Sequence, residues 1–120
     1  MIFDSSALIE TIRAGTGFEE GAISVITLIE VLRGIDDEKK RTKMIGLIKG
    51  AFDILVVDEA VGRAYLELYF ELKNKGELAS DADTLIAATA QSKRETLITA
   101  DRGFLRFEPF IKIRLLDVRK

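Results

Sequence analysis

The chain has 120 residues, contains neither cysteine nor histidine, and carries a formal net charge of −2 at pH 7. Without those two residue types, disulfides, cysteine nucleophiles, histidine bases and the usual zinc ligands are excluded. Chemistry on this chain therefore depends on oxygen ligands and on hard cations such as Mg²⁺ or Mn²⁺. The hydrophobic content of 48% and the lack of a linker-like segment predict a single domain over residues 1–120.

The amino terminus lacks a basic region followed by an apolar one, and no apolar run approaches the roughly 18 residues that span a bilayer. These features predict a cytoplasmic protein. A net charge of −2 exerts no overall attraction on nucleic acid, so an RNA-binding surface has to be a local patch.

Apolar periodicity and turn residues predict strands that alternate with helices. In chain order we expect a strand at 1–3, a helix from Ser5 to about Arg13, a turn at 15–17, a short strand at 22–23, helices beginning at Ser24 and at 36–38, a strand at 53–57, a helix over 58–75, a helix after Ser80, a strand at 96–99 and a last strand at 113–116. This order predicts an α/β fold with three α/β/α layers and a central, mainly parallel sheet.

Two acids directly follow predicted strands. Asp4 comes after the first strand, and Asp101 comes after the strand at 96–99. Because ligands bind outside the carboxyl ends of parallel strands, these acids are expected to share one site. Asp83 lies in the first turn of the helix after Ser80, where a carboxylate favours the positive end of the helix dipole.

Glu30 is a fourth candidate, because it interrupts the apolar run at 23–32. A carboxylate in such a segment is costly to desolvate unless a cation or hydrogen-bond donors meet it.

Each acid also has a simpler interpretation. Asp81 and Asp83 could be helix-dipole acids, and Asp4 could be a helix N-cap. Glu30 could reach solvent or pair with Arg33 or a distant lysine. One shared metal site accounts for all four acids together.

Four segments occur in a characteristic order: F-D-S-S-A-L-I near the start, S-V-I-T-L-I-E-V-L-R-G around Glu30, D-T-L-I-A-A-T-A from Asp83, and L-I-T-A-D-R-G-F around Asp101. In this combination the sequence resembles PIN-domain proteins, and among them the VapC toxins, which are the ribonuclease halves of toxin–antitoxin pairs. The resemblance spans nearly the whole chain.

The resemblance implies that Asp4, Glu30, Asp83 and Asp101 form an acidic Mg²⁺ or Mn²⁺ site that hydrolyses RNA phosphodiester bonds. It also implies that Ser6 and Thr99 are supporting hydrogen-bond donors. The expected partners are an RNA substrate, a VapB-like antitoxin of a type II system and a second copy of the chain.

One position departs from the family pattern. Many members have a further acid two positions after the last aspartate, where this chain has Gly103. We therefore expect one tightly held metal, with a second metal arriving only alongside the substrate phosphate.

Two other functions remain open. A catalytically silent PIN-like interaction module would keep the fold and lack metal-dependent RNA cleavage. A phosphoacceptor signalling domain also places acids at strand ends, but it needs paired acids after the first strand, where Ser5 and Ser6 stand. Labelling by a phosphate donor would identify that class.

The segment 58–75 is more apolar than one buried stripe requires. A stripe at helical spacing is expected to face the core, and it comprises Val61, Ala64, Tyr65, Leu68 and Leu72. Leu66, Tyr69 and Phe70 lie off that stripe, which predicts an oligomer or partner surface. Cover by another helix of the same domain is the alternative.

Basic residues offer possible phosphate contacts. Those near the candidate site along the chain are Arg13, Arg33, Arg102 and Arg106. The run 36–41 is interpreted as a solvated helix start and a solvated basic face, with RNA contact as the alternative.

Overall fold

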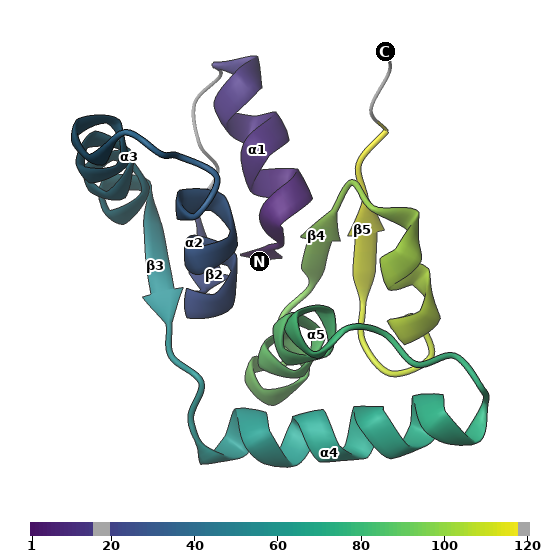
Figure 1. Cartoon of the computed structure of the whole chain (residues 1–120). Helices are drawn as coiled ribbons and strands as arrows, with labels where there is room; N and C mark the ends of the chain where they lie inside the picture. Colours follow the sequence, from purple (N-terminus) through teal and green to yellow (C-terminus); the bar gives the residue numbers. More distant parts are fainter. Residues whose placement is uncertain (16–19, 118–120) are drawn as a thin grey trace.

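The structure is a computed structural model that describes residues 1–15 and 20–117. Its elements are β1 (Ile2–Phe3), α1 (Ser5–Ala14), β2 (Gly21–Ser24), α2 (Val25–Leu32), α3 (Glu38–Ala51), β3 (Phe52–Leu55), α4 (Glu59–Asn74), α5 (Asp81–Lys93), β4 (Leu97–Thr99), the 3₁₀ helix η1 (Arg102–Phe107) and β5 (Ile113–Leu115) (Figure 1). Every predicted strand and helix is present, although β3 ends two residues before the predicted 57. The helix η1 was not predicted, and the predicted turn at 15–17 lies largely outside the described residues.

The five strands form one sheet in the order β3-β2-β1-β4-β5, and every neighbouring pair is parallel. The short β1 strand is the centre of the sheet, because Ile2 pairs with Ala22 of β2 and with Leu97 of β4. The carboxyl ends of β1 and β4 therefore lie side by side. Asp4 and Asp101, which follow these two strands, therefore lie at the same edge of the sheet, as the sequence predicted.

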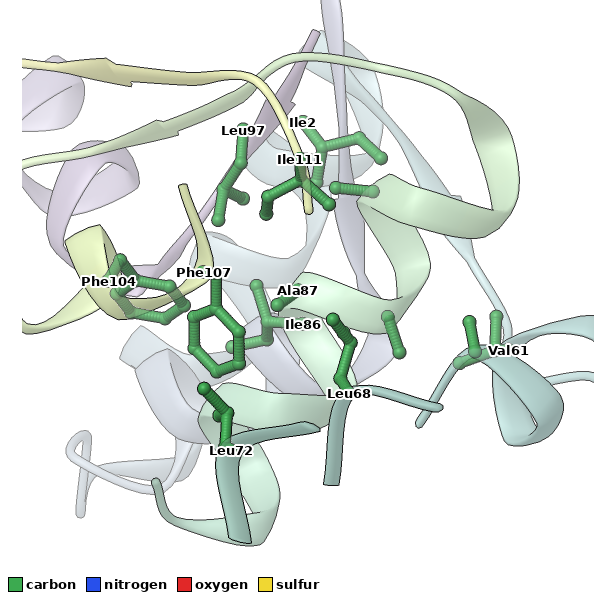
Figure 2. Packing of buried hydrophobic residues seen from close by; sticks show 13 residues of the cluster. Ile2, Val61, Leu68, Leu72, Ile86, Ala87, Leu97, Phe104, Phe107 and Ile111 are labelled. Carbon is green, nitrogen blue, oxygen red and sulfur yellow. The ribbon is translucent and has the colours of Figure 1, made fainter. Parts of the chain in front are cut away.

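Helices cover both faces of the sheet. Because neighbouring side chains of a strand point to opposite faces, Ile2 and Leu97 belong to one hydrophobic cluster and Phe3 and Ile98 to another. The first cluster packs against α4, α5 and η1, and Figure 2 shows its aliphatic and aromatic side chains converging. The second packs against α1, α2 and α3. The predicted three-layer α/β/α fold is confirmed.

Helix α4 buries one face. Val61, Ala64, Leu68 and Leu72 are buried, as their spacing predicts. Leu66 and Phe70 on the other side are each 53% exposed, so within the described residues no helix covers them. The alternative of cover by another helix is therefore wrong for these two residues.

The connection between α4 and α5 sets the position of Asp83. Gly76, at φ +68°, ends α4, and the Ser80 hydroxyl accepts a hydrogen bond from the Asp83 N–H at the start of α5. Arg106 holds the connection, because its guanidinium donates to the carbonyl oxygens of Leu78 at 2.8 Å and of Gly103 at 2.8 Å. Arg106 is therefore engaged with the backbone, which argues against its predicted role as a phosphate contact.

In the part of the chain that the structure describes, no helix is both long enough and apolar enough to cross a membrane.

Two glycine substitutions are expected to change stability in opposite directions. A Cβ on Gly21 would lie 2.8 Å from the Phe3 ring, which is buried and packs edge-to-face on Phe52. Gly21→Ala should therefore lower the free energy of unfolding by about 1–3 kcal/mol, as overpacking does.

Gly46 in α3 has nothing within 4 Å of such a Cβ. Gly46→Ala should raise the free energy by about 0.5–1 kcal/mol. Urea unfolding measures both, and a shift in the same direction would contradict the packing described here.

Candidate metal and active site

Asp4 is held rigidly at the carboxyl end of β1. Its carboxylate is buried and caps α1, with Oδ1 accepting hydrogen bonds from the Ala7 N–H at 2.8 Å and the Ser6 hydroxyl at 2.7 Å. Oδ2 accepts one from the Thr99 hydroxyl at 2.5 Å. The N-cap interpretation is therefore correct. It does not exclude a ligand role, because an ionised carboxylate offers about four acceptor sites and three are used.

Ser6 and Thr99 join β1 to β4. The Ala100 N–H donates to Ser6 Oγ at 2.9 Å, and the Asp101 N–H donates to Thr99 Oγ1 at 2.9 Å. Each hydroxyl thus donates to the Asp4 carboxylate and accepts a hydrogen bond from a backbone N–H, which is that of Ala100 for Ser6 and that of Asp101 for Thr99. The two residues expected to support the acids lie directly beside them.

Asp101 is exposed and begins η1. Its Oδ1 accepts a hydrogen bond from the Gly103 N–H at 2.8 Å. A Cβ on residue 103 would lie only 3.1 Å from that oxygen, so the close turn suits glycine. Residue 103 therefore supplies no carboxylate to the site, as its glycine identity predicted.

Glu30 lies on α2 and is bound by α1. The Ser5 hydroxyl donates to Glu30 Oε1 at 2.6 Å. The alternative that Glu30 pairs with Arg33 is wrong, since within residues 1–15 and 20–117 none of the four candidate acids forms a salt bridge. Ser5 is a supporting residue that the sequence interpretation missed. Its position directly after Asp4 was the available signal.

The two acids at the start of α5 have different surroundings. Asp81 is exposed and accepts a hydrogen bond at 2.6 Å from the Tyr65 hydroxyl, which raises the pKa of Tyr65 to about 12. Asp83, two residues later, is half-buried and lies among the other candidate acids. Both acids lie in the first turn of α5, and Asp83 alone is in the electrostatic environment of the other candidate acids.

The four carboxylates share one electrostatic environment. Burial raises the pKa of Asp83, and the charges of Glu30, Asp101 and Asp4 raise it further. Burial also raises the pKa of Asp4, against the hydrogen bonds from Thr99, Ala7 and Ser6, and the charge of Asp101 adds to the rise. Elements distant in the sequence thus bring these acidic groups into one electrostatic environment, and none of the four forms a salt bridge within the described part of the chain.

As the side chains stand, no three acidic groups among the described residues are placed as ligands of a single metal ion. The charges of Glu30, Asp101 and Asp4 nevertheless act on Asp83, and that of Asp101 acts on Asp4. Oxygen donors gathered in this way, without a counter-charge, suit a hard divalent cation.

A family model described as PIN domain matches residues 1–108, and the chain belongs to this family. Ribonuclease VapC1 of Methanocaldococcus jannaschii is 36% identical over 92% of this chain and 82% of that protein. The identification that the four ordered segments suggested is therefore confirmed.

Solved structures confirm the fold. A chain of the VapBC2 complex from Rickettsia felis, crystallised with a DNA fragment from the promoter, superposes with a TM-score of 0.83 at 22% identity, covering 98% of this chain and 100% of that one. A chain of DNA-bound VapBC from Salmonella typhimurium superposes with a TM-score of 0.82 at 23% identity, covering 94% and 95%.

Proposed function

We propose that this protein is an Mg²⁺- or Mn²⁺-dependent endoribonuclease and the toxin of a type II toxin–antitoxin pair. The observation that supports this most strongly is the group of four carboxylates near the carboxyl edge of the sheet: none of them forms a salt bridge within the described residues, and the charges of the others raise the pKa of Asp83, which burial raises most. Similarity to a protein named as a ribonuclease supports RNA as the substrate.

The residues fit a divalent metal by their chemistry. Asp4, Asp83 and Asp101 would hold it, and Glu30 would complete the set or orient the attacking water. When bound, such a metal reverses the local charge, so that a phosphodiester is attracted, and it lowers the pKa of a coordinated water. Binding would require the half-buried Asp83 and the exposed Asp101 to turn towards Asp4.

The hydroxyls of Ser5, Ser6 and Thr99 would hold two of the four acids in place before a metal binds. Three hydrogen bonds fix the Asp4 carboxylate, so this acid is the rigid member of the set. Ser5 steadies Glu30 on the opposite helix, which leaves one of its oxygens for a water molecule. Fixing some ligands in advance reduces the cost of ordering the others around the ion.

The partners proposed for the chain are an RNA, a VapB-like antitoxin and a second copy of itself. The solved structures with the same fold are toxin–antitoxin complexes, which supports the antitoxin. An RNA-cleaving enzyme of this kind would act in the cytoplasm, where its substrates are.

Cleavage of a panel of single-stranded and structured RNAs with Mg²⁺, Mn²⁺ or a chelator tests this proposal. We expect cuts with either metal and none with the chelator. Calorimetric titration without RNA should give one firmly bound metal per chain, since Gly103 supplies no further carboxylate. A protein that binds metal but cuts no RNA would favour the silent interaction module, and labelling by a phosphate donor would favour the signalling domain.

A further inference from the structure

Helix α3 concentrates positive charge in an acidic protein. It carries five basic side chains and one acidic one, a net charge of +4, while the whole chain has a net charge of −2. Its exposed lysines are Lys39, Lys40, Lys43 and Lys49. In the described part of the chain none of these four lysines takes part in an ion pair.

The first three lysines are unfavourable for the helix itself. Lys39 and Lys40 lie in the first turn, where a cation opposes the positive end of the helix dipole. Lys43 follows them at spacings of four and three residues, and each such like-charge pair costs about 0.2–0.5 kcal/mol. A polyanion bound along this face would reverse both effects. We call Lys39, Lys40 and Lys43 the α3 lysine face.

The α3 lysine face is joined to the acidic site by a short, braced connection. Glu30 lies in the last turns of α2, and only residues 33–37 separate α2 from α3. The Arg41 guanidinium ties α3 to this connection by donating to the Ile35 carbonyl at 2.7 Å. The helix that carries the lysine face is therefore tied to the short connection that follows the Glu30 helix.

Three other basic side chains on the surface take part in ion pairs. Arg13 pairs with Glu10, Arg63 with Glu59, and Lys93 with Asp58. The acidic site itself repels phosphate until a metal binds. A substrate therefore needs a separate basic surface, and the α3 lysine face meets that need.

We propose that the α3 lysine face binds the phosphate backbone of RNA beside the segment that enters the acidic site. This inference rests on the proposed function. Lysines without interleaved aromatic side chains contact phosphates and do not read bases, so the contribution is to affinity and not to sequence choice. An acidic protein segment is the competing occupant.

The test compares two triple variants, one of the α3 lysine face and one of three lysines elsewhere on the surface. Lys39→Gln/Lys40→Gln/Lys43→Gln should raise KM for RNA cleavage about 10-fold, leave kcat nearly unchanged, and reduce the slope of log(kcat/KM) against log salt by about 2. The control triple, Lys75→Gln/Lys93→Gln/Lys112→Gln, removes the same charge and should leave the slope unchanged. Equal effects of the two triples would overturn the inference.

A binding measurement separates this inference from the proposed function. Fluorescence anisotropy with labelled single-stranded polyuridylate should show weaker binding for the lysine-face triple than for the control triple, whether or not the wild type cleaves. Absence of cleavage alone contradicts the nuclease. Unchanged RNA binding, with loss of binding to polyglutamate instead, would show that the face receives an acidic protein segment.

Discussion

Replacing Asp83 with asparagine is expected to reduce RNA cleavage at least about 100-fold, since even partners one shell outside a metal ligand are worth about 10- to 100-fold. The side chain keeps its shape and loses only its charge. Matched assays of wild type and Asp83→Asn in saturating Mn²⁺ measure the effect. Asp53→Asn removes one exposed carboxylate from β3 and should leave the rate unchanged.

The same substitution should stabilise the metal-free protein at neutral pH. The folded-state pKa of Asp83 is raised above 3.8, so the folded protein binds more protons than the unfolded chain between those two pKa values. Stability from this group is therefore present below about pH 3.8 and is lost as pH rises through the folded pKa. Asp83→Asn avoids that loss. Added metal should raise the melting temperature of the wild type and not of the variant. Cleavage at the wild-type rate would show that the assigned site is wrong.

Replacing Phe70 with glutamate is expected to convert the proposed dimer into a monomer. The Phe70 and Leu66 side chains, each 53% exposed, border a groove of about 440 Å³ that also includes Phe110, Gln91 of α5 and the core residue Leu68. Covering the exposed half of Phe70, about 100 Å², is worth about 2.5 kcal/mol per protomer. Losing it from both protomers removes about 5 kcal/mol and should weaken the dimer about 5,000-fold.

Light scattering across a dilution series measures the effect, with Leu47→Glu as the control. Leu47 is 58% exposed on α3, outside the α4 surface, and its substitution should not change the mass. If the wild type is a monomer and Phe70→Glu no longer binds the antitoxin in a pull-down, the surface belongs to the antitoxin interface. If neither mass nor pull-down changes, the interface lies elsewhere.

Much of the site could be predicted from local pattern. Asp4 and Asp101 were found because each follows a short apolar strand, and parallel strands end at one edge. The core face of α4 followed from helical spacing, and the stop at Gly76 followed from its tolerance of positive φ. These features depend on a few neighbouring residues, which the sequence displays directly.

Other features depend on contacts between distant segments. Nothing local marks Ser5 as the partner of Glu30 or Arg106 as the brace of the α4–α5 connection, because each contact joins residues more than twenty positions apart. The helix η1 escaped prediction because residues 102–107 combine glycine with aromatic residues and show no helical stripe; they are helical because Phe104 and Phe107 pack into the core.

The layered α/β fold and the family could be predicted from the sequence, and the four acids could be proposed from it, because strand ends, helix starts and hydrophobic spacing are local properties. The surroundings of each acid could be known only from the folded chain. In the structure Asp81 accepts a hydrogen bond from Tyr65, whereas Asp83 lies among the candidate acids. Glu30 accepts a hydrogen bond from the Ser5 hydroxyl and forms no ion pair with Arg33. Leu66 and Phe70 are exposed. These outcomes depend on which helices meet across the sheet, since charge, burial and exposure are set by neighbours in space.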